Sequence, residues 1–133
     1  FDRTIEKNGL KETANRLGKG IIAFSPLAQG LLTDRYLHGI PEDSRIRTDG
    51  RFLKESTLTE EKLEQIRALN AIAAARGQTL AEMALAWILK DGQVTSVLIG
   101  ASRPEQILDD LKALDNTAFT PDELRAIDAA SGF

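Results

Sequence analysis

The sequence contains no cysteine and only one histidine, His38, among its 133 residues. The absence of cysteine excludes disulfides, thiolate metal sites and a thiol nucleophile, and one histidine cannot form a multi-histidine metal site. No apolar run reaches the roughly 18 residues that a membrane-spanning helix needs, and no signal-peptide pattern is present. We therefore expect a soluble, cytoplasmic chain without a metal centre.

The sequence also has no concentrated block of positive charge. The 17 basic residues are scattered among 20 acidic ones, and the net charge is −3. Nucleic acids and anionic membranes select concentrated positive charge, so we expect neither as a partner. A hydrophobic fraction of 42% over this length suits one domain with its own core, residues 1–133. The first residue is Phe1 rather than methionine, so the printed sequence need not start where its gene starts.

The clearest pattern lies in residues 94–111. The run from Val94 to Ile99 is short, apolar and rich in β-branched residues, as expected of a strand that is covered on both faces. Gly100 ends the run, and a glycine there lets the backbone turn or approach a ligand closely. The residues that follow predict the start of a helix.

That helix start has the features of an anion site. Ser102 and Glu105 fit a capping box, and Pro104 stands in the first helical turn, where its missing N–H costs nothing. A helix N-terminus just beyond the carboxyl end of a strand presents free N–H groups and a partial positive charge. Arg103 adds a full positive charge. A phosphate site is one interpretation, and an ordinary serine cap beside a surface arginine is the other.

A second apolar run, residues 21–24, predicts another buried strand, followed by a polar loop over residues 25–32. Amphipathic patterns and caps predict five helices, at residues 10–17, 60–76, 80–90, 104–114 and from 121 onward. The helices at 60–76, at 80–90 and from 121 onward open with capping boxes at Thr57/Glu60, Thr79/Glu82 and Thr120/Glu123, and Gly77 and Gly92 close the first two of these. In the fourth, Ile107, Leu108, Leu111 and Leu114 are expected to face inward. Alternating helices and strands indicate an α/β protein whose site lies at the carboxyl ends of the strands.

Residues 33–56 show no regular pattern and hold four arginines, Arg35, Arg45, Arg47 and Arg51. A loop of this length is either a functional lid or a solvated segment. The two predicted strands are apolar on both faces, and two short strands do not form a stable sheet alone. We therefore expect this chain to be part of a larger α/β fold.

Two segments resemble signatures of the aldo-keto reductase superfamily, most closely the branch of bacterial glyceraldehyde 3-phosphate reductase-like enzymes and potassium-channel β-subunits. Residues 24–33, Phe-Ser-Pro-Leu-Ala-Gln-Gly-Leu-Leu-Thr, are similar to the family's strand-seven signature, followed by Arg35-Tyr36 and by residues 39–45. Residues 96–102, with Gln106 and the pair Asp109-Asp110, are similar to the strand-eight signature, although Asp110 stands where the family usually has asparagine.

The resemblance implies the C-terminal portion of a (β/α)8 TIM barrel: strands seven and eight, their helices and a C-terminal helix. It also implies an NADP(H)-binding enzyme part whose parent reduces small aldehydes or ketones by hydride transfer. The implied cofactor contacts come from the loop after strand seven (Ser25, Pro26, Leu27, Gln29, Gly30, Leu31), from the long segment (Arg35, Arg45) and from strand eight and its helix (Gly100, Ser102, Arg103, Gln106, Asp109, Asp110).

No catalytic residue is assigned. The family's tyrosine, lysine, aspartate and histidine come from the first half of the barrel, and neither Tyr36 nor His38 matches their positions. Tyr36 is expected to pack against the cofactor or the loop, His38 to be an idle surface residue, and Trp87 to belong to the core. Two alternatives remain open: a nucleotide-sensing regulatory module like the channel β-subunits, and an inactive truncated barrel fragment. A homo-oligomer is compatible with each.

Overall fold

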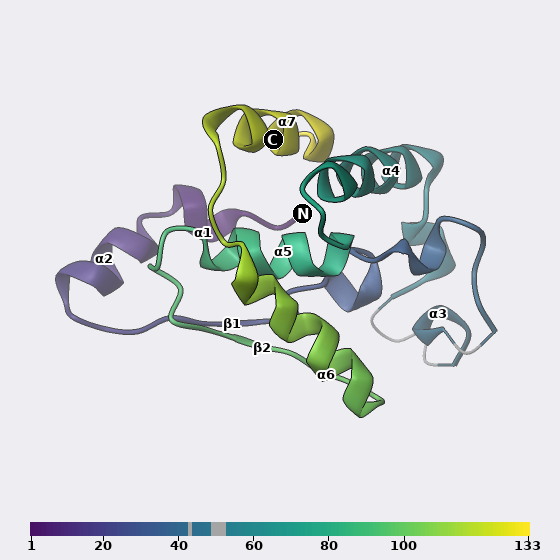
Figure 1. Ribbon diagram of the computed structural model, residues 1–133, viewed down its shortest axis with the longest axis horizontal. Helices are drawn as coiled ribbons and strands as arrows, with labels where there is room; N and C mark the ends of the chain where they lie inside the picture. The colour runs from purple at the N-terminus through teal and green to yellow at the C-terminus, as the bar shows by residue number, and fades with distance from the viewer. Residues whose placement is uncertain (43, 49–52) are drawn as a thin grey trace.

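A computed structural model describes residues 1–42, 44–48 and 53–133. The described residues form an α/β arrangement in which two strands, β1 (Ile22–Phe24) and β2 (Ser96–Leu98), pair in parallel. The prediction of two strands is confirmed, although both are shorter than the apolar runs suggested. The long connection between them carries two helices, α4 (Glu60–Ala75) and α5 (Leu80–Leu89), as a parallel pair requires. Figure 1 shows the two strands side by side, with α5 above them and α4 further out.

The remaining helices flank this centre. They are α1 (Thr4–Lys7), α2 (Leu10–Arg16), α3 (Arg45–Thr48), α6 (Pro104–Leu111) and α7 (Pro121–Ser131). Three-residue 3₁₀ turns occupy Ala28–Gly30, Asp34–Tyr36 and Glu55–Thr57, and a fourth turn, Lys112–Asp115, extends α6. The absence of regular structure expected over residues 33–56 is therefore only partly correct, because short helical turns interrupt that segment. Residues 43 and 49–52, which include Arg51, lie outside the described residues.

Local capping explains where the long helices begin and end. The Thr79 and Thr120 side chains accept from the N–H groups of Glu82 and Glu123, and each glutamate bonds back, so these two capping boxes are confirmed. The box predicted at Thr57 is wrong, because Thr59 caps α4 and accepts from the Lys62 N–H. Thr57 is already taken up by the preceding 3₁₀ turn.

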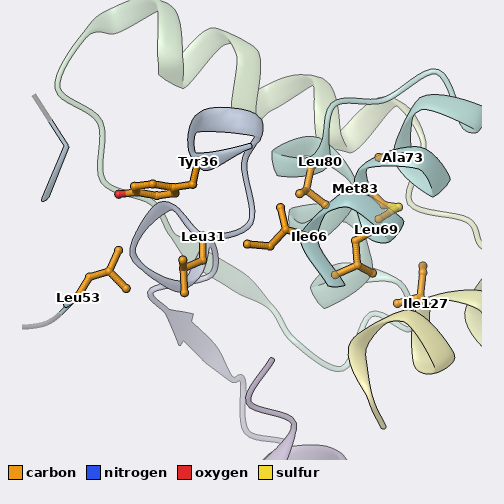
Figure 2. Close-up of a cluster of buried hydrophobic side chains, with 9 residues drawn as sticks. All are labelled: Leu31, Tyr36, Leu53, Ile66, Leu69, Ala73, Leu80, Met83 and Ile127. Carbon is orange, nitrogen blue, oxygen red and sulfur yellow. The ribbon is translucent and has the colours of Figure 1, made fainter. Parts of the chain in front are cut away.

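The main hydrophobic core lies where α4, α5 and α7 meet the segment after β1. Figure 2 shows its nine buried side chains: Leu31, Tyr36, Leu53, Ile66, Leu69, Ala73, Leu80, Met83 and Ile127. Trp87 is half-buried and packs against this cluster, as the periodicity of its helix predicts. A second, smaller cluster of Leu85, Ala86 and Ala113 joins α5 to the turn after α6, and Leu27, Val97, Ile99 and Phe119 pack on it.

Two burial predictions are wrong for this chain. Only one face of the sheet is covered, because Ala23 and Val97 are half-buried whereas Ile22, Phe24 and Leu98 are exposed. The leucines and isoleucine of α6 were expected to face inward, yet Ile107, Leu108, Leu111 and Leu114 are also exposed. In both places the described chain supplies no element that could cover the apolar face.

Candidate functional site

Two loops leave the sheet next to each other, at the carboxyl ends of the two strands. The parallel register sets Phe24 opposite Leu98, the last residue of each strand. The loop that follows β1 and the turn that follows β2 therefore leave the sheet at the same edge. This is the edge at which α/β proteins place their sites, and the sequence predicted that the candidate residues converge there.

The loop after β1 has an unusual backbone. Ser25, Ala28 and Gln29 have φ angles of 50°, 48° and 61°, and Gly30 continues with 94°. Left-handed backbone costs roughly 1–2 kcal/mol per residue that is not glycine. Such strain persists only where the surrounding structure enforces it, and it concentrates at functional sites.

Hydrogen bonds and packing hold the loop in this conformation. The Ala28 N–H donates to the Ser25 carbonyl at 3.0 Å, and the Gly30 N–H donates to the Leu27 carbonyl at 2.9 Å. The Gln29 side-chain amide donates to the Ser25 hydroxyl at 3.3 Å. The side chains of Leu27 and Leu31 pack into the two hydrophobic clusters. The loop is therefore held by the packing of Leu27 and Leu31 against the core, and its backbone has this conformation without a ligand.

The start of α6 differs from the expected capping box. Arg103 is the N-cap and Pro104 the first helical residue, so Ser102 lies one residue outside the helix. The reciprocal bond comes from Gln106 rather than Glu105. Its side-chain oxygen accepts from the Ser102 N–H at 2.8 Å, the Ser102 hydroxyl at 3.1 Å and the Arg103 N–H at 3.3 Å. The sequence pattern Ser-x-x-Glu pointed to the wrong pair because Arg103, with an extended backbone, begins the helix instead.

This geometry supports an oxygen ligand at the start of α6. Three donors from Ser102 and Arg103 converge on one oxygen atom, and they lie at the positive end of the helix. A phosphate oxygen is an acceptor of the same kind as the Gln106 carboxamide oxygen and is attracted by the same dipole, so it can use these donors by replacing the Gln106 oxygen. The Arg103 side chain is exposed and forms no ion pair with any residue that the structure describes. It is therefore available to an anion.

The two aspartates of α6 lie in different surroundings. Asp109 pairs with Lys112 at 2.8 Å on the open surface. Asp110 is half-buried and lines a groove between α5, β2 and α6. Burial, followed by the nearby carboxylates of Asp109 and Glu82, raises the pKa of Asp110 above its ordinary value. Asp110 lies one helical turn after Gln106 on α6, and contact of either aspartate with a cofactor stays a prediction.

Other predicted residues are distributed along the same edge. Gly100 is exposed and lies two residues after β2. Pro26 lines a cavity of about 100 Å³ beneath the β1 loop, together with Trp87 and Ile127. Arg35 is half-buried in its 3₁₀ turn. Arg45 begins α3, but its side chain lies outside the description. Tyr36 is 3% exposed and packs within the loop, and His38 is exposed, as expected of both.

The sequence did not reveal two buried cations. Arg3 donates to Asp128 and to the Ser131 hydroxyl and stacks over Trp87, so it joins the N-terminal segment to α7. Lys11 bridges Glu6 at 2.7 Å and Asp91 at 2.6 Å. Arg3 also lines the cavity beneath the β1 loop, together with Pro26 and Trp87. No local pattern could have identified these networks, because the partners Asp91, Asp128 and Ser131 lie 80 to 128 positions away.

Other site classes find no support in the part of the chain that the structure describes. Among residues 1–42, 44–48 and 53–133, no three histidine or carboxylate side chains are grouped so that they could hold a metal ion. Within the same ranges, no helix is both long and apolar enough to cross a membrane.

Comparisons with known proteins agree with the resemblance. The chain is 52% identical over 131 residues to the L-glyceraldehyde 3-phosphate reductases of Escherichia coli K12 and O157:H7, which covers 96% of this chain and 38% of either relative. It is 40% identical over 120 residues to a potassium channel subunit beta-like protein of Schizosaccharomyces pombe, covering 87% of this chain and 35% of that protein. The chain thus spans less than two fifths of the length of these curated relatives.

Solved structures give the same answer. The glycerol dehydrogenase of Gluconobacter oxydans superposes with a TM-score of 0.74 at 28% identity, over 98% of this chain and 39% of that chain. A thermostable aldo-keto reductase superposes with a TM-score of 0.62 at 26% identity, over 97% of this chain and 36% of that one. The profile of the Aldo/keto reductase family matches residues 1–131. The chain therefore belongs to the aldo/keto reductase family.

Proposed function

We propose that this chain is the NADP(H)-binding part of an aldo-keto reductase barrel, with β1 and β2 as barrel strands seven and eight. The parent barrel reduces a small aldehyde or ketone, consistent with the reductase named among the relatives. When bound, the nicotinamide supplies the hydride for that reduction. The single observation that carries the proposal is the meeting of the strained β1 loop and the α6 N-terminus at one edge of the strand pair.

The two loops suit different parts of one extended ligand. The α6 start offers a helix dipole, the donors of Ser102 and the guanidinium of Arg103, which together select a doubly charged phosphate monoester. The 2′-phosphate that distinguishes NADPH from NADH is such a group. The loop from Ser25 to Leu31 offers preset backbone groups for the ribose and pyrophosphate. Because both loops are fixed before binding, little ordering entropy opposes association.

The chain's own residues provide no general acid in this proposal. Tyr36 is the only tyrosine, and its 3% exposure in the core keeps it away from a substrate. His38 lies on the exposed side of the segment after β1. The proton donor therefore belongs to other barrel strands, and this chain on its own binds cofactor without turnover.

A second candidate function is a nucleotide-sensing regulatory module. The 40% identity to the Schizosaccharomyces pombe channel subunit beta-like protein favours it. Such a module would bind the same cofactor through the same loops, so the discriminating observation is the partner. Co-purification as a tetramer with a membrane protein supports the module, whereas carbonyl reduction without such a partner supports the enzyme. An inactive fragment would show neither activity nor cofactor binding.

Titration of NADPH into the 133-residue chain, followed by nicotinamide fluorescence, tests the proposal. We expect saturable binding that Arg103→Ala weakens by roughly 10- to 150-fold, because a charge-assisted hydrogen bond to phosphate contributes roughly 1.5–3 kcal/mol. The preference for NADPH over NADH should fall by the same factor. Arg125→Ala is the matched control, since Arg125 is an exposed arginine on α7 that pairs with Asp122. Equal weakening by both substitutions, or no binding at all, would count against the proposal.

A further inference from the structure

A small cavity lies beneath the loop after β1, between three helices and the N-terminal segment. It encloses about 100 Å³, and its walls are apolar side chains of α4, α5 and α7, together with Phe1, Pro26 and Leu32. Figure 2 shows four of the walls, Leu69, Leu80, Met83 and Ile127, where the helices meet. An apolar cavity of about 150 Å³ binds a molecule such as benzene, so the volume here suits a ligand with one small ring.

Two polar side chains at the cavity differ in their hydrogen bonding. The Arg3 guanidinium is 7% exposed and already donates to Asp128 and Ser131. Trp87 also lines the cavity, and its indole Nε1 is buried without a hydrogen-bond partner among the residues that the structure describes. A buried indole N–H normally donates to a partner, and leaving that bond unmade is unfavourable. An acceptor atom on a bound molecule would complete it.

The charges at the walls favour an uncharged occupant. The lining side chains include the Arg3 guanidinium, which is paired with Asp128, and the Asp2 carboxylate, which accepts from Thr4. An anion would therefore meet no unpaired cation among the lining side chains, and a cation would lie close to Arg3. Burying a charge without a partner is unfavourable, so the cavity selects against both.

We propose that this cavity binds a small, uncharged molecule with an apolar ring and one hydrogen-bond acceptor, which accepts from the Trp87 indole N–H. The apolar walls bury the ring, and the N–H orients it, as in ligand sites generally. Pro26 and Leu32 place the ligand directly beneath the candidate cofactor loop. The site requires no cofactor, so the inference is independent of the proposed function.

Benzene and pyridine are matched probes, because they share one ring size and differ in a single acceptor nitrogen. Each is titrated into the 133-residue chain above neutral pH, where pyridine is uncharged, and methyl ¹H–¹³C spectra follow Leu32, Met83 and Ile127. We expect saturable shifts of these methyl groups. Trp87→Phe keeps an aromatic ring but removes the N–H, so the affinity for pyridine relative to benzene should fall about fivefold. An unchanged ratio would overturn the acceptor contact and with it the proposal.

A second variant tests the cavity without removing the indole. Ala84 lines the cavity from α5, so Ala84→Leu should fill it and weaken both probes at least about tenfold. Thermal unfolding should be unchanged or shifted upward, because added apolar contacts replace open volume. Ala74→Leu adds the same side chain at an exposed position of α4 and should leave both affinities unchanged. No saturable shift with either probe, or binding that Ala84→Leu leaves intact, would overturn the site.

The same titration in a longer chain tests whether the cavity stays open there. In a chimera the present chain replaces the 131 residues that it matches in the Escherichia coli K12 reductase. Every wall of the cavity belongs to the present chain, so both probes should bind within about threefold of the same affinity. Loss of binding in the chimera would show that residues before Phe1 fill the cavity and would overturn the proposal. NADPH is absent from each titration, so the result does not depend on the cofactor site.

Discussion

At the scale of single residues, the β1 loop shows how conformation is preset by its surroundings. Ala28 and Gln29 adopt left-handed backbone at φ of 48° and 61°, a region that only glycine enters without strain. The loop accepts this because Leu27 and Leu31 are anchored on either side in hydrophobic clusters. The strain is thus offset by burial and holds the candidate cofactor loop in one shape.

Relieving that strain should stabilise the chain. Ala28→Gly is expected to raise the free energy of unfolding by about 0.5–1 kcal/mol, the left-handed cost of alanine less the added entropy of glycine in the unfolded chain. Ala68→Gly, at an exposed position inside α4, should lower it by about 1 kcal/mol. Urea unfolding of both variants measures the difference. Destabilisation by both substitutions would show that the Ala28 backbone is not strained.

The buried ammonium of Lys90 should make the stability of the fold depend on pH. Its ammonium is buried without a hydrogen-bond partner among the described residues, 3.6 Å from the Glu6 carboxylate and 3.6 Å from the centre of the Trp87 ring. Burial lowers the pKa of Lys90 below its ordinary value of 10.5, against the attraction of Glu6. Between the lowered value and 10.5 the unfolded chain binds more protons than the folded one, so this residue's contribution to stability rises with pH.

Lys90→Met should therefore raise the free energy of unfolding near pH 7 by about 1 kcal/mol and remove part of its increase toward pH 10. Urea unfolding at several pH values measures both effects. Lys19→Met, at an exposed position, is the control and should change neither. A stability profile of Lys90→Met that runs parallel to that of the unsubstituted chain would contradict the lowered pKa.

At the scale of elements, Arg76 links the C-terminal helix α7 to α4. Arg76, which caps α4, pairs with Glu123 of α7 at 2.7 Å and donates to the Ala118 carbonyl at 2.9 Å. Its guanidinium stacks over Phe119 at 3.7 Å, and its side chain is only 3% exposed. A planar group with several donors is needed to make these contacts at once.

Arg76→Lys should accordingly lower the free energy of unfolding by about 2 kcal/mol, because lysine cannot satisfy the carboxylate and the carbonyl together. Arg67→Lys on the same helix is the matched control: its pair with Glu60 is exposed, so we expect a change below about 0.5 kcal/mol. Urea unfolding distinguishes them, and cleavage by a protease between residues 116 and 120 should be faster only in Arg76→Lys. Equal effects would show that the stack and carbonyl bonds do not contribute.

Sequence patterns predicted where the helices and strands lie better than they predicted which residues are buried. Capping residues and glycines located the long helices within one or two positions, since Thr79, Thr120 and Gly77 act through neighbours in sequence. The N-cap of α6 was misplaced by one residue, because two overlapping patterns, ending at Glu105 and Gln106, compete and only the backbone of Arg103 decides between them. The left-handed Ala28 has no signature at all.

At the scale of the whole molecule, apolar patterning predicted burial that this chain alone does not provide. The sequence pattern predicts that Phe24, Leu98 and the leucines of α6 are buried. They are exposed because no described element covers them. Local periodicity records which face a residue belongs to, but not whether the covering element is part of the same chain. The candidate site could be predicted more fully, since it needs only the two strands whose ends carry it, and the parallel register brings those ends together.

A cofactor site at the ends of β1 and β2 is tested most directly by an amide ¹H–¹⁵N spectrum of the 133-residue chain, titrated with adenosine 2′,5′-bisphosphate and then with NADPH. We expect the bisphosphate to shift the resonances of Ser102, Arg103 and Gln106, and NADPH to shift those of residues 25–31 as well. Shifts confined to other parts of the chain, or none at the start of α6, would contradict a cofactor site at the ends of β1 and β2.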